Sequence, residues 1–317
     1  MGTNSTRLLV AEVIDGQVVA ELERESRVTR LGRGVDLSDQ LAAGAIEETC
    51  AAVAEYVAQA GRLEVSRTVA IATSAVRDAS NSDAFIAELR ERFGLEARTL
   101  DGAEEARLTY LGAIAADGAS VSTLVIDIGG GSTEFVLGSG PGVEQHVSLQ
   151  VGAVRHSERH LREDPPSPAE LEHLAGNVRE AIDDTVAEWE QAPSGSDTER
   201  GDETSGSGSG APPKGIAVAG TATSLAAIDL ALEPYDPDAV EGHVLPLESV
   251  QRMCSELSAL PLAKRQEVTG LHPDRAPTIV AGTVILIQAM RAFGLAEILI
   301  SERDLLYGAA LEAAAGQ

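Results

Sequence analysis

The sequence lacks the features that would place it in a membrane or an oxidising compartment. No apolar run in its 317 residues reaches the ~20 residues that span a bilayer. The N-terminus has neither a basic region nor a signal-type apolar core. Only two cysteines are present, Cys50 and Cys254, and they form no C-x-x-C pair, which favours reduced thiols. We therefore expect a cytoplasmic protein with no membrane partner.

Basic residues are also scarce. The chain carries 24 Lys and Arg against 50 Asp and Glu, a formal net charge of −26. Because binding to polyanions normally calls for a basic surface, we expect no nucleic-acid partner. The acidity is interpreted as charge on solvated helix faces. Any site for a smaller anion must therefore concentrate its arginines locally.

The segment Leu124 to Leu137, L-V-I-D-I-G-G-G-S-T-E-F-V-L, has the pattern of two strands joined by a glycine turn. Asp127 and Glu134 flank this turn. The turn suits phosphate oxygens, because glycines expose backbone N–H groups and the following hydroxyls add donors: Gly129, Gly130, Gly131, Ser132 and Thr133. Two carboxylates beside an anion site repel phosphate unless a divalent cation lies between them, and hard oxygen ligands indicate Mg²⁺. The alternative is an ordinary glycine hairpin.

The N-terminus repeats this turn. Met1 to Val10 aligns without a gap with Ile128 to Leu137, and the alignment matches Gly2, Ser5 and Thr6 to a glycine, a serine and a threonine of the second hairpin. Two such hairpins predict a duplicated α/β unit with a ligand between the halves. Neither hairpin leads into a helix after its glycines. That excludes a P-loop or a dinucleotide-binding fingerprint.

The paired hairpins resemble those of the acetate and sugar kinase, Hsp70 and actin superfamily. Further segments narrow the resemblance to the exopolyphosphatase/guanosine pentaphosphatase (Ppx/GppA) family, in its short two-domain form. These segments are A-T-S-A-V-R-D-A-S-N at Ala72 to Asn81, D-G-A-E-E-A-R at Asp101 to Arg107, A-G-T-A-T-S at Ala219 to Ser224, and D-R-A at Asp274 to Ala276. The resemblance covers nearly the whole chain. The arginines of its motifs, which are the places to look for local positive charge, are Arg7, Arg77, Arg155 and Arg275.

The resemblance implies an α/β fold with two ribonuclease-H-like (actin-like ATPase) domains, whose mixed sheets are flanked by helices and separated by a cleft. The N-terminal domain is expected over residues 1–118 and the C-terminal domain over residues 119–303. A closing helix, residues 304–317, is expected to pack back on the first domain. Residues 192–213 are rich in Gly, Ser and acidic side chains without an apolar anchor, so a disordered insertion is expected there.

The resemblance also implies an activity and its residues. It points to an exopolyphosphatase that hydrolyses the terminal phosphoanhydride of inorganic polyphosphate with Mg²⁺, and K⁺ is a candidate second cation. Glu105 would be the general base, Asp127 and Glu134 the metal ligands, and the protein a homodimer. The phosphate-binding residues would be Gly2, Thr3, Asn4, Ser5, Arg7, Arg77, Gly129, Gly130, Gly131, Ser132, Thr133, Gly220 and Thr221.

The helix pattern after residue 101 gives separate support for Glu105 over its neighbour Glu104. Adjacent helical residues point about 100° apart, so the two glutamates cannot both face one cleft. Glu104 shares its stripe with Leu108, on the apolar face, whereas Glu105 aligns with Thr109 and Gly112 on a polar and small face. Glu105 is therefore the predicted cleft residue. The alternative is that both glutamates complement the helix dipole.

Other functions stay open at this stage. Within the family, the substrate is inorganic polyphosphate, guanosine pentaphosphate (pppGpp), hydrolysed at its 5′ end, or a nucleoside triphosphate. A small-molecule kinase of the same superfamily is a rival, although the E-E-A-R-L-T-Y-L-G segment favours the exophosphatase. A non-catalytic polyphosphate or nucleotide sensor is the third hypothesis.

The first domain is expected to open with three antiparallel strands, over residues 6–13, 17–24 and 26–31. The repeat also predicts a strand before them. Because Met1 aligns with Ile128, the first copy has no counterpart of Asp127 or of the strand that carries it. A strand that loses several residues leaves its neighbours' backbone groups unpaired. We therefore expect the native protein to begin upstream of Met1.

Overall fold

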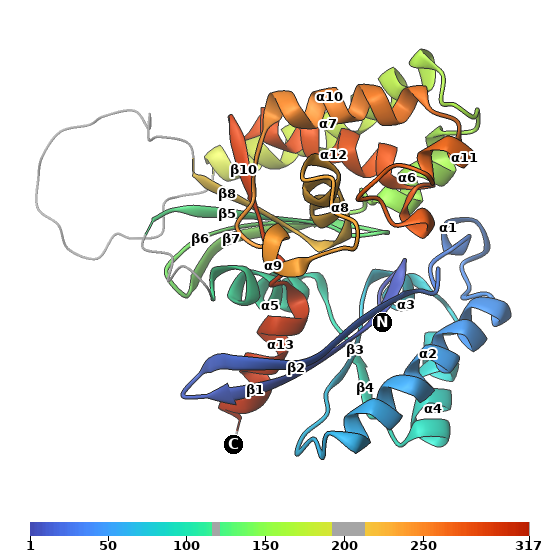
Figure 1. The fold of residues 1–317 in the computed structure, drawn as a ribbon, viewed down its shortest axis with the longest axis vertical. Coiled ribbons are helices and arrows are strands. Elements are labelled where there is room, and N and C mark those ends of the chain that lie inside the picture. The colour runs from blue at the N-terminus through green and yellow to red at the C-terminus, as the bar shows by residue number, and fades with distance from the viewer. Residues whose placement is uncertain (116–120, 192–212, 317) are drawn as a thin grey trace, which may run out of the picture.

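The computed structural model describes residues 1–115, 121–191 and 213–316 and contains one six-stranded mixed sheet and two two-stranded sheets (Figure 1). The strands are β1 Ser5–Ile14, β2 Gln17–Val28, β3 Ala70–Ala72, β4 Ala97–Thr99, β5 Thr123–Ile128, β6 Thr133–Ser139, β7 Gly142–Leu149, β8 Lys214–Val218, β9 Val244–Pro246 and β10 Glu297–Ile300. The helices are α1 Val35–Ser38, α2 Ala43–Arg62, α3 Ser74–Asp78, α4 Ser82–Phe93, α5 Gly102–Ile114, α6 Ala153–His160, α7 Pro168–Gln191, α8 Ala219–Asp229, α9 Pro237–Val240, α10 Leu247–Ala259, α11 Leu262–Arg265, α12 Ile279–Ala292 and α13 Leu305–Ala315, with a 3-10 turn at Pro273–Arg275. Apart from residue 213, the insertion expected over residues 192–213 lies outside the described residues.

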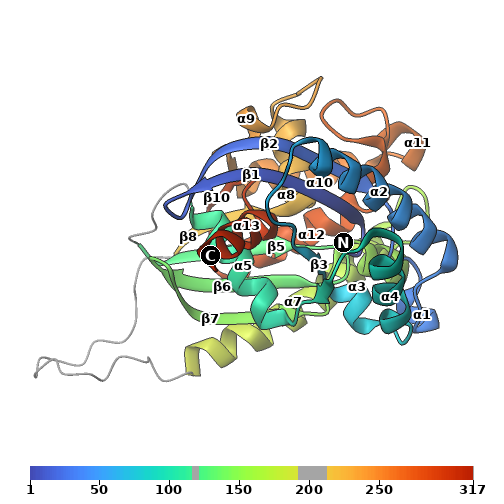
Figure 2. The same ribbon diagram turned by 90° about the horizontal axis from the view of Figure 1, so that it is seen from below.

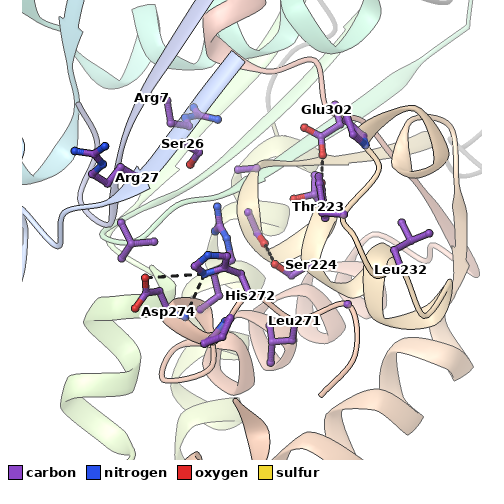
Figure 3. A pocket seen from close by; sticks show the side chains of 18 of the residues that line it. Arg7, Ser26, Arg27, Thr223, Ser224, Leu232, Leu271, His272, Asp274 and Glu302 are labelled. Atoms are coloured by element: carbon purple, nitrogen blue, oxygen red, sulfur yellow. Dashed lines mark hydrogen bonds and ion pairs between the residues drawn. The ribbon is translucent and has the colours of Figure 1, made fainter. Parts of the chain in front are cut away.

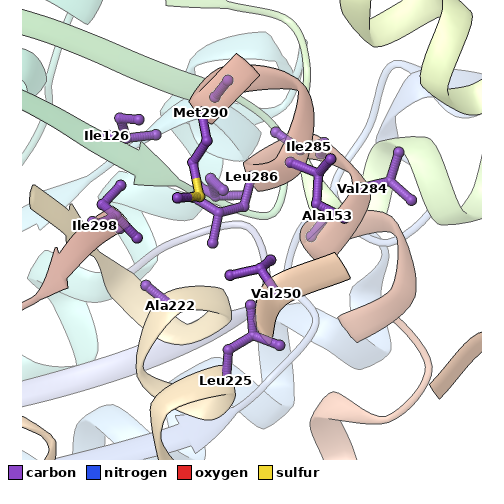
Figure 4. Packing of buried hydrophobic residues seen from close by; sticks show 14 of the residues in the cluster. Ile126, Ala153, Ala222, Leu225, Val250, Val284, Ile285, Leu286, Met290 and Ile298 are labelled. Carbon is purple, nitrogen blue, oxygen red and sulfur yellow. The ribbon is translucent and has the colours of Figure 1, made fainter. Parts of the chain in front are cut away.

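The large sheet has the order β7-β6-β5-β8-β10-β9, with β5, β8 and β10 parallel. Both of its faces are covered, so β5 is apolar at nearly every position. Leu124 and Ile126 face the core formed with α7, α8, α10 and α12, and Figure 4 shows Ile126 in that cluster. Val125 and, on β6, Val136 pack on the other side against α5. This alternation decides which β5 and β6 side chains reach the site described below.

The first two strands form one long hairpin and not the predicted three strands. Asp15 and Gly16 make the turn in the left-handed conformation, and β2 continues to Val28 without a break. The predicted strand over residues 26–31 was therefore wrong. The pairing of β1 with β2 shifts register twice, so Val19 and Leu22 have no partner residue on β1. Both side chains are about half exposed. Such bulges disturb the period of two that sequence patterns depend on.

The last helix, α13, lies beside both the first hairpin and α5 (Figures 1 and 2). Glycines allow α5 and α13 to approach closely. A Cβ on Gly112 would lie 2.1 Å from the Asp304 carbonyl oxygen, and one on Gly308 would lie 1.9 Å from that of Leu108. The expected domain boundaries at residues 118 and 303 stay a prediction. No helix in the described ranges is long and apolar enough to span a bilayer.

Candidate active site

The two glycine turns have the same backbone geometry and meet face to face. Gly2 N–H donates to the Ser5 carbonyl at 2.9 Å, and Gly129 N–H donates to the Ser132 carbonyl at 3.0 Å. These are the positions that the sequence repeat aligns. A Cβ on Gly130 would lie 3.0 Å from the Thr3 side chain, so the turns are in contact. The predicted duplication is therefore present at the level of the turns.

A cavity of about 120 Å³ lies between these turns. Its wall combines both turns with the start of α8, and includes Gly2, Thr3, Asn4, Ser5, Arg7, Glu105, Asp127, Gly129, Gly130, Ser132, Glu134, Gly220, Thr221 and Arg275. Within the described residues, no hydrogen bond uses the N–H groups of Thr3, Asn4 or Gly130. The first N–H groups of α8 are also free of helical partners. The cavity is therefore rich in donors for an anion.

Two strands and one helix bring three carboxylates to one side of this cavity. Asp127 on β5 and Glu134 on β6 are direct cross-strand partners, so their side chains point to the same face of the sheet. That face is covered by α5, whose first turn carries Glu105. The Thr109 hydroxyl of α5 donates to Asp127 at 3.4 Å, and Ser148 donates to Glu134 at 2.8 Å.

These three carboxylates are buried, with 6% exposure for Glu105, 7% for Asp127 and 1% for Glu134. Burial, and the nearby charges of Asp304 and Glu105, raise the pKa of Asp127 to about 7. Burial, Glu105 and Asp127 hold the pKa of Glu134 well above its usual value. Burial also raises the pKa of Glu105, although the Arg77 guanidinium opposes this. Burial and mutual repulsion thus disfavour the ionised forms of these carboxylates in the protein alone.

The residues fit a magnesium ion that completes its shell with other oxygens. Neither Asp127 nor Glu134 has an ion-pair partner among the described residues. No group of three His, Cys, Asp or Glu side chains in those ranges is placed to hold a metal ion. Mg²⁺ commonly takes only one or two carboxylates and fills the remaining positions with waters and substrate phosphate oxygens. Asp127 and Glu134 are therefore compatible with Mg²⁺ and stay the predicted ligands.

Glu105 lines the cavity and Glu104 does not, as the helix pattern predicted. Asp101 caps α5 by accepting from the Glu104 N–H at 2.8 Å, which places the glutamates in the first turn. Glu104 points outward and pairs with Arg98 at 2.6 Å. Arg77, from α3, donates to Glu105 at 3.1 Å and to the Leu100 carbonyl at 2.9 Å. Arg77 thus holds the Glu105 carboxylate through an ion pair.

Three residues predicted to bind phosphate do not line this cavity: Gly131, Thr133 and Arg77. The Thr133 hydroxyl is buried and donates to the Val151 carbonyl at 2.5 Å, so it is already used. A Cβ on Gly131 would collide with Ser74 and Thr3, which makes Gly131 a packing residue between the turns. Phosphate binding by these three residues stays a prediction.

Two charged residues that the predicted site omitted lie close by: Arg275 lines this cavity, and Asp304 lines the larger cavity described below. Arg275 belongs to the D-R-A segment, and its guanidinium lies over Gly220, where an added Cβ would be 1.5 Å away. No ion pair or hydrogen bond of the Arg275 guanidinium is formed with the described residues, and burial together with the nearby Arg7 lowers its pKa. Asp304, just before α13, is buried and pairs with Arg7. Of these two residues, only Arg275 could be found from the sequence, because it lies in the D-R-A motif.

A larger cavity of about 820 Å³ adjoins the first, and Arg7, Ala219, Gly220, Arg275 and Leu306 line both. Figure 3 shows Arg7, Ser26 and Arg27 on one side, from the β1–β2 hairpin, and Thr223, Ser224 and Glu302 on the other. Four arginines and six carboxylates line it: Arg7, Arg24, Arg27 and Arg275 with Glu25, Glu233, Glu267, Asp274, Glu302 and Asp304. Arg7, Arg24 and Arg27 are each paired with a carboxylate.

The two contacting turns, the six-stranded mixed sheet and the carboxylates at the small cavity define a phosphate-binding protein of the actin-like ATPase fold class. The family model of the Ppx/GppA phosphatase family matches residues 9–314. The chain is 33% identical over 334 aligned positions to Exopolyphosphatase 2 of Mycobacterium tuberculosis, covering 99% of this chain and 96% of that protein. The chain therefore belongs to the Ppx/GppA phosphatase family.

Two further similarities bear on fold and substrate. A solved structure of an exopolyphosphatase-like protein superposes with a TM-score of 0.86 at 30% identity, covering 98% of this chain and 94% of that one. The fold predicted from the sequence is thus confirmed. The chain is also 25% identical to the guanosine-5′-triphosphate,3′-diphosphate pyrophosphatase of Photobacterium profundum, over 93% of this chain and 54% of that longer protein.

Proposed function

We propose that this protein is an exopolyphosphatase that removes orthophosphate from the end of inorganic polyphosphate. The observation that carries the proposal is the position of Glu105. Its carboxylate lines the cavity between the two glycine turns, close enough to Asp127 and Glu134 to raise the pKa of both. A terminal phosphoryl group bound by the free N–H groups of Thr3, Asn4 and Gly130 would lie within this cavity.

In the proposed reaction Glu105 accepts a proton from a water molecule while the water oxygen bonds to the terminal phosphorus. The phosphoanhydride P–O bond on the opposite side breaks, and its electron pair stays with the shortened chain. Arg77 holds the Glu105 carboxylate in place through the 3.1 Å ion pair. Arg275 and the backbone N–H groups stabilise the negative charge of the transferring group.

The proposed cofactor is Mg²⁺ held by Asp127 and Glu134, and a bound divalent cation supplies charge neutralisation for the phosphate oxygens. The burial of the two carboxylates without an ion-pair partner in the described ranges supports this assignment. K⁺ stays a candidate second cation. Because Asp127 and Glu134 repel each other when both are ionised, their geometry is expected to depend on a cation.

The test is an assay of orthophosphate release from polyphosphate, pppGpp and ATP, each with Mg²⁺ and with EDTA. Mg²⁺-dependent release from polyphosphate in excess over the other two supports the proposal. Phosphate transfer from ATP to an added sugar or acid, without net release, would instead indicate a kinase. Binding of polyphosphate without turnover of any of the three would indicate a sensor.

A second candidate function, nucleoside triphosphatase, is favoured by the large cavity. Its carboxylates outnumber its arginines, and three of the four arginines are already paired. Such a wall suits an uncharged nucleoside better than a long polyanion. A nucleoside triphosphate would place its phosphates towards the small cavity and its uncharged nucleoside in the large one, whereas pppGpp would also bring its 3′-diphosphate against the acidic wall. A higher kcat/KM for ATP than for polyphosphate in the same assay would favour this candidate.

We further propose that the protein acts in the cytoplasm as a homodimer. Cys50 and Cys254 are both free thiols, which supports a reducing compartment. The half-exposed apolar side chains of Ile14, Val19 and Leu22 on the outer hairpin offer a surface for a second copy. Sedimentation of the purified protein measures the oligomeric state directly.

A further inference from the structure

Arg7 occupies the junction between the two cavities. It projects from β1, two residues after the first glycine turn, and lines both cavity walls. Its guanidinium pairs with the Asp304 carboxylate, which is 2% exposed. Asp127 is also near enough to raise the pKa of Arg7, and Arg7 in turn opposes the raised pKa of Asp127. The guanidinium therefore lies within electrostatic reach of Asp127, one of the two proposed metal ligands.

Asp304 is held rigidly. One of its carboxylate oxygens accepts from the Leu306 N–H at 3.0 Å and caps α13, and the other accepts from Arg7. Its backbone carbonyl lies against Gly112 of α5, where not even a Cβ fits. Because α5 also carries Glu105, the position of Asp304 is tied to the helix that forms one wall of the site.

A guanidinium free to move would be drawn towards Asp127 and Glu134. These carboxylates are buried and, within the described ranges, have no ion-pair partner, and attraction between opposite charges is strong where water is excluded. A guanidinium also matches carboxylates with two parallel hydrogen bonds. An arginine bound in this way would occupy the position that a divalent cation needs.

We propose that Asp304 is a positioning residue that holds Arg7 away from the Asp127–Glu134 pair and so keeps these two carboxylates open to a divalent cation. This inference rests on the metal site of the proposed function. It assigns to Asp304 a role beyond capping α13. Loss of the Asp304 charge releases Arg7, and Arg7 then competes with the cation for the same oxygens.

The test is direct binding of Mn²⁺, by isothermal titration calorimetry, to the full-length metal-stripped protein without substrate. The variants are Asp304→Asn, Arg7→Gln and the double variant Arg7→Gln/Asp304→Asn. Asparagine keeps an oxygen that can cap α13 but loses the charge that binds Arg7. Asp304→Asn is expected to weaken Mn²⁺ binding by about 10- to 100-fold, the range typical for residues behind metal ligands.

The double variant is expected to recover most of the wild-type affinity, because the competing guanidinium is gone. Arg7→Gln alone is expected to bind Mn²⁺ at least as tightly as the wild type. A double variant as weak as Asp304→Asn, or weaker binding by Arg7→Gln, would overturn the inference. A purely structural role of Asp304 would not produce this recovery.

Circular dichroism melts show which variants fold, and Asp304→Ser, which also caps helices, replaces Asp304→Asn if the latter does not fold. Should neither fold, the Arg7→Gln measurement still decides the outcome. Wild-type protein that binds no Mn²⁺ would contradict the metal site of the proposed function itself. Wild-type binding with unchanged affinity in Asp304→Asn would contradict only the role of Asp304.

Discussion

Glu105 is the side chain whose loss is expected to cost the most activity. Glu105→Gln should lower kcat by ~10²–10⁴-fold, because the variant cannot accept the proton of the attacking water. Substrate binding should persist, since the turn N–H groups that bind phosphate are unchanged. Glu104→Gln is the matched control: Glu104 lies outside the cavity and pairs with Arg98, so its kcat should stay near wild type. Equal losses in both variants would contradict the assignment.

His156 on α6 is expected to make stability depend on pH. It is 1% exposed; its Nδ1 accepts from the Gly152 N–H at 3.3 Å, and Nε2 lies 3.3 Å from Asn177 Oδ1. Burial lowers the pKa of His156 to about 4. Folding therefore favours the neutral ring, so its contribution is complete above pH ~6.5 and is lost as the pH falls towards 4, a change of about 2–4 kcal/mol.

The measurement is the melting temperature from pH 7.5 to pH 4.5 for the wild type and His156→Gln. The variant starts less stable at pH 7.5, and the difference between the two should shrink as the pH falls. His146→Gln, at an exposed position on β7, is the control and should follow the wild type throughout. A constant difference between wild type and His156→Gln would show that the pKa of His156 is the same in the folded and unfolded states.

At the scale of elements, the close packing of α5 on α13 should make Gly308 intolerant of substitution. In Gly308→Ala the added methyl would lie 1.9 Å from the Leu108 carbonyl oxygen, which belongs to a helix backbone and cannot turn aside. Overpacking of this kind costs ~1–3 kcal/mol. Because α5 carries Glu105, activity should fall as well.

Gly176 on α7 is the matched control for this substitution. A Cβ there meets nothing within 4 Å, so Gly176→Ala should be neutral or stabilise the protein by up to ~1 kcal/mol through helix propensity. Urea denaturation measures both variants. A Gly308→Ala protein as stable as Gly176→Ala would mean that the two helices can separate without cost.

The elements also show where sequence reasoning succeeds. Asp127 and Glu134 could be paired from the sequence because strand alternation and a short turn fix which residues lie opposite each other. The extent of β2 could not, because the bulges at Val19 and Leu22 interrupt that alternation. Asp304 was missed since its partner, Arg7, is 297 residues away, and nothing local in the sequence links them. Thr133 matched the motif, yet its hydroxyl is used by Val151.

For the whole molecule, the net charge of −26 predicts an unusual response to salt. An acidic protein and a polyanion repel each other at long range, and salt screens that repulsion over a Debye length of ~10 Å at 0.1 M. The kcat/KM for polyphosphate should therefore rise between ~20 and ~200 mM salt, where proteins with a basic polyanion site lose affinity.

Initial rates at low substrate concentration measure this effect. KCl and tetramethylammonium chloride should be compared at equal ionic strength, because screening is common to both salts, whereas a bound K⁺ acts only in the first. A fall of kcat/KM in both salts would show that local attraction by Arg275 and its neighbours outweighs the repulsion of the whole surface.

The position of α13 also has a consequence for the order of folding during synthesis. Arg7 and Glu21, in the β1–β2 hairpin, bind Asp304 and Tyr307, which follow them by 297 and 286 residues. At translation rates of ~5–20 residues per second, the hairpin waits roughly 15–60 s for these partners. For that time the surface that α13 later covers stays open to other proteins. A complete chain refolding from denaturant holds both partners from the start, so the nascent and the refolding protein encounter different aggregation hazards.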